Sequence, residues 1–387
     1  MIRPTLSVRL AALYGAMFTA FGIVMPYLSP WFASRGLSVS EIALLAAVPH
    51  VVRVFSTPVI AFLADRHDAH RQALLLLAIA GACAWAAMVP ARAFWWLLLL
   101  QVLIGLTHAM LPLTETIAMH GVRRQGIDYG RVRLWGSVTF IAGALLAGQL
   151  VARYGIEVIM IPIIASAVVT ALAAAALPAT SSSRVDVDQQ RSVMARLSFA
   201  DVKALLQDRA LLLLLLANSA VQASHAMLYT FGSLHWKSLG ITADWIGALW
   251  AVAVLTEIAL FAVAGHFLRT VSATLVLALG CAGATLRWLI MSIDPAFGLL
   301  LLLQTSHGVS FGLSHLGIVY ALARMVPPSR LGTATALSSV PTALMFAAVT
   351  PLAGLVYDWG GGLGYLAMSV LSAIGLGAAL LVSYRRT

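Results

Sequence analysis

Long apolar segments alternate with short polar ones along the whole chain. A helix needs roughly 20 mostly apolar residues to cross the hydrocarbon core of a bilayer. Charges, prolines and glycines mark where each apolar segment begins and ends. The pattern predicts twelve membrane-spanning helices, at about residues 9–33, 40–63, 72–90, 94–118, 131–153, 157–177, 210–235, 243–266, 272–292, 296–321, 331–356 and 362–383.

One polar stretch is much longer than the others and divides the spans into two sets of six. It covers residues 179–208 and carries a serine run, Ser181–Ser183, together with several charges. Such a composition is typical of a linker, here with a short amphipathic segment, rather than of a folded domain. The predicted organisation is an N-terminal six-helix bundle at residues 1–178, a cytoplasmic linker at 179–208 and a C-terminal six-helix bundle at 209–387.

Composition adds to the case for a membrane location. Of the 387 residues, 61% are hydrophobic and only 10% are charged, and the mean hydropathy is +0.94. A soluble protein could not hide so much apolar surface, whereas lipid accepts it. The first apolar run continues to about Phe32, which is too long for the core of a cleaved signal peptide. We therefore expect a retained first helix.

The net charge of +10 does not indicate nucleic-acid binding, because the basic residues lie in short loops between apolar spans. Cytoplasmic loops of membrane proteins carry an excess of lysine and arginine. With the N-terminus inside, the outside loops hold only Arg35, Arg92, Arg153 and Lys237. We predict a multi-pass protein of a bacterial-type cell inner membrane with both termini in the cytoplasm.

Several ionisable residues fall inside the predicted spans. A charge at the bilayer centre costs at least about 2.5–3.5 kcal/mol on insertion scales, so such residues are rarely idle. They could form structural ion pairs between helices, or they could line a polar cavity. Their number and their presence in both halves favour the cavity. The charged members are Arg53, Glu115, Arg133, Glu257 and Arg287, and the histidines are His50, His108, His225, His307 and His315.

Spacing places some of these residues on common helix faces. Glu115 follows His108 by seven residues, or two helical turns, so both would share a face of the fourth span. His307, Ser310 and Ser314 would likewise share a face of the tenth span. For any single histidine, a structural role as a hydrogen-bonding residue stays an alternative to a functional one.

Two features of the chain resemble major facilitator transporters. The halves echo each other, since Leu106–Ala109 in the fourth span is similar to Thr305–Gly308 in the tenth. The loop Asp65–Arg71 resembles the superfamily's signature between helices two and three, although Ala61 and Ala69 replace its usual glycines. The resemblance implies an all-α membrane protein with twelve transmembrane helices in two pseudo-symmetric six-helix bundles, which bind substrate between them near mid-membrane. It also implies a gating loop that contains Asp65, Arg66 and Arg71.

A more specific resemblance lies at the start of the fifth span. The run Asp128–Ser137 is similar to the Gly-Arg-x-Arg-x-x-Gly segment of lactose permease and its oligosaccharide:proton symporter relatives, and closer still to the phenylpropionate permease branch. Gln222–Ala226 extends this similarity into the seventh span. The family's substrate-binding Glu and Arg fall at Glu115 and Arg133. The candidate substrate-binding residues are Glu115, Arg133, Arg53, His108 and His225.

The proton-coupling residues of that family match only in part. Arg287 and His307 fall at the positions of the family's helix-nine Arg and helix-ten His, with the same separation. The family's proton-carrying Glu lies one turn beyond that His, and this position is Ser310 here. Glu257 is the best substitute carboxylate, with His307 as the alternative carrier. The candidate proton-coupling residues are Glu257, Arg287, His307 and His315.

Three intramembrane arginines against two glutamates leave one excess positive charge, and arginine binds carboxylates bidentately. We therefore expect a proton-coupled importer of a small organic solute such as an aromatic carboxylate. The alternative is a sugar or nucleoside:proton symporter, because Glu115 with Arg133 suits hydroxyl recognition. Drug efflux fits the apolar composition but not the charge cluster. Candidate aromatics for an apolar subsite, which could instead only pack the helices, are Tyr14, Phe18, Phe21 and Tyr229.

The sequence carries no enzymatic signature: it has no Walker loop, no HExxH, no GxSxG and no carboxylate-rich metal cluster. We expect neither an enzyme nor a metal site, and no cofactor, with a proton gradient as the driving force. A receptor would be expected to carry a signalling domain, and no such domain is expected from this sequence. The expected partners are a small-molecule substrate and the lipid bilayer, without nucleic acid, for a functional monomer.

Overall fold

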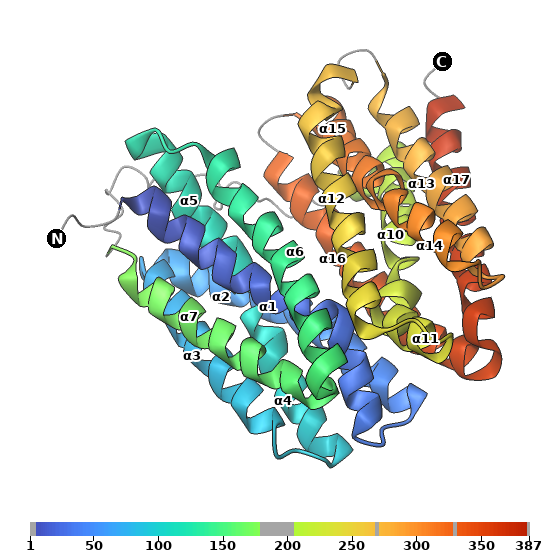
Figure 1. The fold of residues 1–387 in the computed structure, drawn as a ribbon. Helices are drawn as coiled ribbons and strands as arrows, with labels where there is room; N and C mark the ends of the chain where they lie inside the picture. The colour runs from blue at the N-terminus through green and yellow to red at the C-terminus, as the bar shows by residue number, and fades with distance from the viewer. Residues whose placement is uncertain (1–4, 179–204, 268–270, 328–330, 385–387) are drawn as a thin grey trace. The chain divides into compact units, whose positions relative to one another are not determined.

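A computed structural model describes residues 5–178, 205–267, 271–327 and 331–384, and every regular element in these ranges is a helix. The first six spans are formed by α1 (Leu6–Ser34), α2 (Val39–Arg66), α3 (His70–Met88), α4 (Phe94–Thr107) with α5 (Met110–Gln125), α6 (Tyr129–Tyr154), and η1 (Ile156–Ile159) with α7 (Met160–Ala176). The other six are α10 (Arg209–Ala223) with η2 (Leu228–Gly232) and α11 (Ser233–Ser238), α12 (Ala243–Phe267), α13 (Ala273–Met291), α14 (Phe297–Thr305) with η3 (Gly308–Leu313) and α15 (Ser314–Met325), α16 (Leu331–Gly360), and, after η5 (Gly361–Leu363), α17 (Gly364–Tyr384). Figure 1 shows them as ribbons.

The number of spans is confirmed for the described residues. Eleven segments are long and apolar enough to cross a membrane, and the last of them, Leu337–Val382, contains parts of both α16 and α17. These segments therefore comprise twelve spans. The helices continue beyond several predicted ends, because a helix extends past the apolar residues that mark a span. α5, for example, reaches Gln125, whereas the apolar pattern ends at about residue 118.

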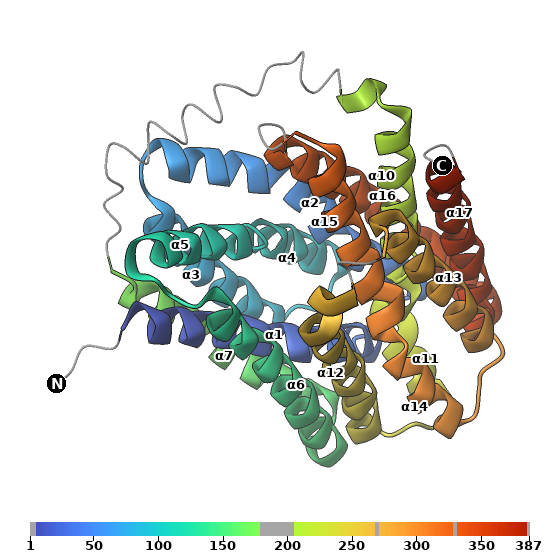
Figure 2. The ribbon, with the colours of Figure 1, turned by 90° about the horizontal axis from the view of Figure 1, so that it is seen from above.

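Three spans are interrupted. α4 ends at Thr107 and α5 begins at Met110, and the two follow one another along the fourth span (Figure 2). The cause is Pro112, which lacks an N–H and whose ring clashes with the carbonyl four residues earlier, at His108. Spans seven and ten contain the π-helical segments η2 and η3. No continuous helix therefore connects His108 to Glu115, in contrast to the expectation from their spacing.

Side-chain caps explain where several helices begin. At the start of α2, the Ser38 hydroxyl accepts from the backbone N–H of Glu41, whose carboxylate accepts in turn from the N–H of Ser38. This reciprocal pair satisfies two otherwise unpaired donors. Asp128 caps α6, Asp208 caps α10 and Ser272 caps α13 through single side-chain oxygens. The polar loops therefore set the helix starts as well as separating the spans.

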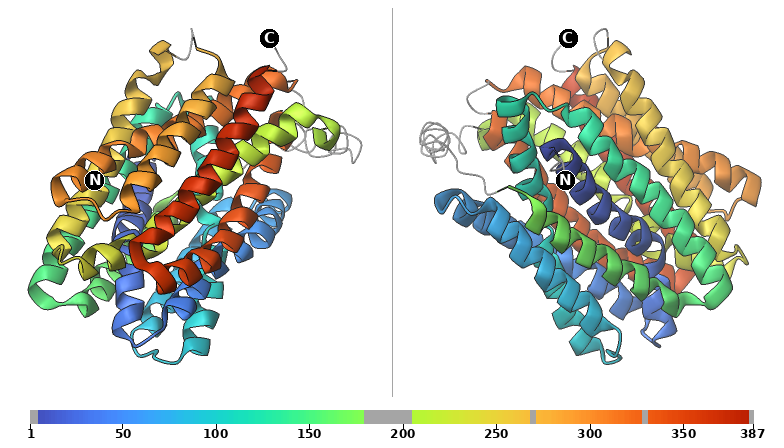
Figure 3. Two further views of the ribbon diagram at one scale, coloured as in Figure 1. Left: turned by 90° about the vertical axis from the view of Figure 1, so that its right-hand side faces the viewer. Right: turned by 60° about the vertical axis from the view of Figure 1, so that its left-hand side comes forward.

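The chain forms two compact units: Met1–Ser183 with Gly232–Ala251, and Arg184–Phe231 with Val252–Thr387. In the first unit α1 packs against α6 and α7, and α3 packs against α7 (Figure 3). In the second unit α10 packs against α16 and α17, and α13 packs against α17. The same pairing occurs in both units, as expected for two structural repeats. The linker predicted at 179–208 lies almost wholly outside the described residues, so the domain boundaries stay a prediction.

Polarity is inverted relative to a soluble protein. Leu76, Leu172 and Val370 are exposed at 68%, 64% and 58%, whereas Arg287 and His225 are exposed at 1% and 0%. Lipid can cover the apolar surface, and polar side chains inside a bilayer must face the protein interior. The chain is a multi-pass membrane protein.

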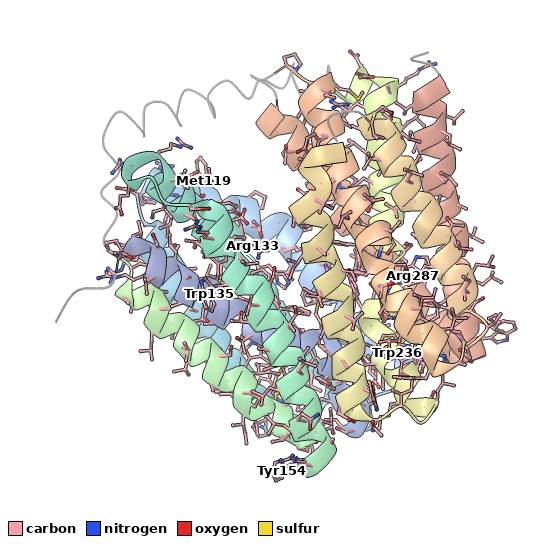
Figure 4. The ribbon with its side chains drawn as sticks, turned by 45° about the horizontal axis from the view of Figure 1, so that its top comes forward. Met119, Arg133, Trp135, Tyr154, Trp236 and Arg287 are labelled. Carbon is pink, nitrogen blue, oxygen red and sulfur yellow. The ribbon has the colours of Figure 1, made fainter. Side chains whose placement is uncertain are left out.

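Exposed aromatic residues lie near helix ends. Trp95 and Trp96 begin α4, Trp245 lies near the start of α12 and Trp359 near the end of α16. Tyr154, labelled in Figure 4, ends α6. Trp and Tyr are enriched at membrane–water interfaces, where an apolar ring and a polar tip both find suitable surroundings. In the predicted topology all these helix ends lie on the outer side of the membrane.

Candidate substrate and proton-coupling site

Glu115 and Arg133 lie near the same two tyrosines in the first unit. In the described part of the chain they form no ion pair with each other. The Tyr129 hydroxyl donates to Oε1 of Glu115 over 3.3 Å. The Arg133 guanidinium lies 4.2 Å from the ring centroid of Phe18 and 5.6 Å from that of Tyr14. Both charges act on the hydroxyls of Tyr14 and Tyr129. The glutamate and the arginine therefore flank two phenols, and aromatic faces hold the guanidinium.

Three helices position these side chains. α1 carries Tyr14 and Phe18, α5 carries Glu115, and the first two turns of α6 carry Tyr129 and Arg133. Residues four apart lie on one helix face, so Tyr129 and Arg133 both point toward α1 and α5. Figure 4 labels Arg133 on α6. The aromatic residues of α1 pack its contact with α6 and at the same time present ring faces to the guanidinium, while a role in substrate binding stays a prediction.

A second cluster of the first unit joins α2 to the fourth span. The rings of His50 and His108 have centroids 6.4 Å apart, and the charge of Arg53 acts on both imidazoles. Close helix packing permits this approach, because a methyl group at Gly105 would come within 2.7 Å of Val52 Cβ. The structure thus brings together Arg53 and His108 from the candidate substrate-binding residues, and adds His50.

In the second unit Arg287 is fully buried and bonded through both terminal nitrogens. Nη1 donates to Nδ1 of His307 over 3.1 Å and to Oγ of Ser310 over 3.0 Å. Nη2 donates to Oε1 of Gln304 over 2.9 Å. The guanidinium also lies 4.8 Å from the ring of Trp288. A buried charge is tolerated only when such partners satisfy it, so this arginine is held in one orientation.

This arrangement fixes the tautomer of His307. Arginine has only donors, so Nδ1 of His307 must accept from Arg287 and the neutral ring carries its proton on Nε2. Nε2 faces Oε2 of Glu257 at 3.7 Å. The N–H of His307 therefore points toward the carboxylate, and the three side chains form a chain from guanidinium to carboxylate. The structure brings Arg287, His307 and Glu257 together.

His225 belongs to the cluster of Arg287, His307 and Glu257 and not to the residues around Glu115. Its Nδ1 donates to the carbonyl of Val221 over 2.9 Å, which leaves Nε2 as an acceptor. Nε2 lies 3.4 Å from Oγ of Ser310, whose hydroxyl is the donor. Hydrogen bonds therefore run from Arg287 through Ser310 to His225. The hydroxyl at 310, which replaces the family's carboxylate, has a defined place as a hydrogen-bonding link.

Backbone geometry around η3 sets the reach of this cluster. His307 immediately precedes η3, and Gly308 is its first residue. A methyl group at Gly308 would lie 3.0 Å from the carbonyl of Thr256 on α12, so a larger residue would require the two helices to move slightly apart. The close contact brings His307 within reach of Glu257. π-Helical turns are frequent at functional sites because they redirect side chains.

The remaining candidate residues belong to none of these three clusters. The ring of Phe311 stacks on His307 at 5.3 Å and on His315 at 6.2 Å, so an aromatic ring stands between the two histidines. Across the turn between α2 and α3, Nε2 of His70, the first residue of α3, lies 2.6 Å from Oδ1 of Asp65 in the last turn of α2. Arg66 is exposed. The structure does not bring the three gating-loop candidates into one network.

Two arginines donate hydrogen bonds to carbonyls at the C-terminal end of α7. Nη2 of Arg71 donates to the carbonyl of Ala175 over 2.6 Å, and Nη1 of Arg9 donates to that of Ala176 over 2.7 Å. The last carbonyls of a helix lack partners within it, and cations favour this negative end of the dipole. Arg71 therefore joins the start of α3 to the end of the sixth span.

Sequence reasoning missed several residues of these clusters. Gln304 precedes His307 by three residues, a spacing that places both on one helix face and was the available signal. Tyr129 lies inside the Asp128–Ser137 motif. His70 became evident only from its contact with Asp65. Within the described residues, no group of three or more His, Cys, Asp or Glu side chains is arranged to hold a metal ion.

Comparison with known proteins identifies the family. Residues 7–364 match the model of the MFS_1 like family. The chain belongs to this family. As an MFS_1 like protein it is a secondary transporter of the major facilitator type, and the resemblance to that superfamily inferred from the sequence is confirmed.

Two relatives align with nearly the whole MFS_1 like chain. The probable 3-phenylpropionic acid transporter of Escherichia coli (strain K12) is 28% identical over 382 residues, which cover 96% of both chains. The maltose permease of Geobacillus stearothermophilus is 28% identical over 377 residues, covering 96% of this chain and 93% of the relative.

Solved transporter structures share the fold. The crystal structure of the nucleoside transporter NupG superposes with a TM-score of 0.80 and 16% identity, covering 98% of this chain and 99% of that one. The D-xylose-proton symporter gives a TM-score of 0.71 and 13% identity, with 97% and 96% covered. These likenesses confirm the twelve-helix major facilitator architecture.

Proposed function

We propose that this MFS_1 like protein imports a small organic solute, such as an aromatic carboxylate of the phenylpropionate type, together with protons. It acts as a monomer in a bacterial-type inner membrane with both termini in the cytoplasm. The observation that carries the proposal is the chain formed by the buried Arg287 and His307 with the partly buried Glu257 in a transporter of this family. Such a chain joins a carboxylate to a fixed positive charge through a neutral imidazole that accepts on Nδ1 and carries its proton on Nε2.

The relative named as a probable 3-phenylpropionic acid transporter supports an aromatic acid as the substrate. An excess of intramembrane arginine over glutamate agrees with an anionic solute, since arginine binds carboxylates bidentately. The ring faces of Tyr14 and Phe18 beside Arg133 offer an apolar surface for an aromatic group. Glu115 and Arg133 contribute to substrate binding on this proposal.

Proton coupling is assigned to Glu257 with His307. Nδ1 of His307 accepts from Arg287 and so cannot bind a proton while that contact persists. Glu257 accordingly carries the proton, and His307 links it to Arg287 through its two ring nitrogens. Substrate that alters the position of Arg287 or His307 would alter the proton affinity of Glu257, which is the linkage that a symporter needs.

One observation favours a second candidate, a sugar or nucleoside:proton symporter. Glu115 accepts a hydrogen bond from a hydroxyl, that of Tyr129, and a carboxylate in this setting could accept equally from a sugar hydroxyl. The relative named maltose permease agrees with this alternative.

Uptake by purified protein in proteoliposomes tests the function. We expect labelled 3-phenylpropionate to accumulate when the outside is acidic and not when the pH gradient is collapsed. Thermal melting against aromatic acids, sugars and nucleosides gives an independent test, because a ligand of the folded state raises its apparent stability. Uptake that ignores the gradient would contradict coupling, and stabilisation only by sugars or nucleosides would favour the second candidate.

A further inference from the structure

The three arginines of the spans differ in the groups that contact their guanidinium. Arg287 donates to three acceptors and is fully enclosed. Arg133 stacks on aromatic rings and shares two phenols with the carboxylate of Glu115. Arg53 lies in the middle of α2, and among the described residues no acidic side chain acts on it and no acceptor contacts it. Of the three, Arg53 is therefore the one whose guanidinium is left with neither a hydrogen-bond acceptor nor an aromatic face or phenol in contact among the described residues.

The neighbours of Arg53 do not supply the missing negative charge. His50 lies one turn before Arg53 on the same face of α2. The ring of His108, from the fourth span, lies next to that of His50. Nδ1 of His108 donates to the carbonyl of Ile104 over 3.3 Å, so Nε2 is its acceptor atom. Imidazoles can orient a ligand through hydrogen bonds, but they add no anion. A partly buried guanidinium without a counter-charge inside a membrane span is costly, and a site for an anionic ligand removes that cost.

Among the three arginines, Arg53 is also the one that could bind a carboxylate without losing an existing contact. Glu115 would repel a second carboxylate beside Arg133, and the stacked guanidinium of Arg133 has its face covered by Phe18. Arg287 is fully buried, so a carboxylate would have to displace the side chains that enclose it. Neither restriction applies to Arg53, whose planar fork can bind both oxygens of one carboxylate.

We propose that Arg53, together with His50 and His108, forms the subsite that binds the carboxylate of the transported solute. This inference rests on the proposed function, because it assumes an acidic substrate. It separates two tasks: the cluster on α2 and the fourth span selects the anion, and the cluster around Glu115 and Arg133 contacts the remainder of the solute.

Calorimetric binding to the purified full chain tests the subsite with two probes, 3-phenylpropionate and its uncharged amide. We expect Arg53→Gln to weaken binding of the acid by about 10- to 100-fold, the range for losing hydrogen bonds to a charged group. Binding of the amide should stay unchanged. Arg53→Lys keeps the charge but not the fork, so it should fall between wild type and Arg53→Gln. Arg92→Gln, which removes an exposed loop arginine, is the control and should bind the acid normally.

The outcomes separate this inference from the proposed function. Equal binding of the acid by wild type and Arg53→Gln overturns the subsite and leaves the importer intact. Parallel loss of acid and amide binding also overturns it, because a carboxylate subsite must discriminate. A wild-type protein that binds sugars or nucleosides but no carboxylate overturns both the subsite and the aromatic-acid substrate. If Arg53→Gln does not fold, Arg53→Lys decides: wild-type affinity for the acid in that variant overturns the subsite.

Discussion

Nη1 of Arg287 lies 3.1 Å from Nδ1 of His307, and this contact between α13 and the residue before η3 orders the interior of the second unit. It determines which imidazole nitrogen carries the proton, and so which one faces Glu257. Arg287 is in turn held by Gln304 and Ser310. The orientation of one ring thus depends on acceptors that lie on the same span as the histidine.

Gln304→Leu should destabilise the protein. Nη2 of the buried Arg287 would lose its acceptor, and an unsatisfied buried donor costs about 1–3 kcal/mol, or more for a charged group. Thermal melting in detergent measures the effect. Thr305→Val is the matched control, because Thr305 is the next residue and is exposed. Equal melting temperatures for the two variants would show that Gln304 does not support Arg287.

Glu115→Gln and Arg133→Lys should abolish uptake and leave the protein in the membrane. Lysine cannot reproduce the planar guanidinium that stacks on Phe18 and can bind two oxygens at once. Initial rates in vesicles, normalised to the amount of protein, measure the loss. Trp135→Phe alters an exposed side chain two residues from Arg133 (Figure 4) and should transport normally. Near-normal uptake by Arg133→Lys would leave Glu115 and Arg133 with a structural role only.

The positive-inside distribution predicts which loops face the cytoplasm. In a chain with Cys83 and Cys281 replaced by alanine, Gln125→Cys at the end of α5 should react with a membrane-impermeant maleimide only in inside-out vesicles. Arg92→Cys, between α3 and α4, should react only in right-side-out vesicles. Both positions are exposed. The opposite labelling pattern would reverse the topology.

The membrane made the fold predictable from sequence. Backbone groups in lipid must be satisfied within each segment, so long apolar runs become helices with few alternatives. The break in the fourth span also had a local signal, Pro112, four residues beyond the disturbed carbonyl. The π-helical segments had none, because no proline lies in η2 or η3 and the apolar pattern runs through both without a break.

The chemistry of the candidate site was less accessible from sequence. Family positions named Arg287 and His307, but the motif could not say which atom of the ring accepts from the guanidinium. Counting charges gave one excess arginine, yet only the neighbours on other helices distinguish Arg53 from Arg133. Contacts between helices depend on packing distances, as at Gly105, that hydrophobic periodicity does not encode.

Glu257→Gln tests whether this carboxylate carries the coupled proton. Glutamine resembles the protonated carboxyl group but cannot release a proton, so the empty carrier could not complete a cycle of net uptake. A loaded carrier need not release its proton to exchange one substrate molecule for another. We therefore expect no accumulation against a gradient and near-normal exchange of labelled for unlabelled substrate in the same proteoliposomes.

The comparison that decides this prediction is with a carboxylate elsewhere in the chain. Glu157 pairs with Arg35 at 2.6 Å at the far end of α1, away from the intramembrane charges, and Glu157→Gln should accumulate substrate normally. If Glu257→Gln still accumulates substrate under a proton gradient, Glu257 is not the carrier. Proton transfer would then require His307 to bind a proton on Nδ1, which means releasing Arg287. In that case His307→Gln should lose accumulation and keep exchange, which is the result expected above for Glu257→Gln.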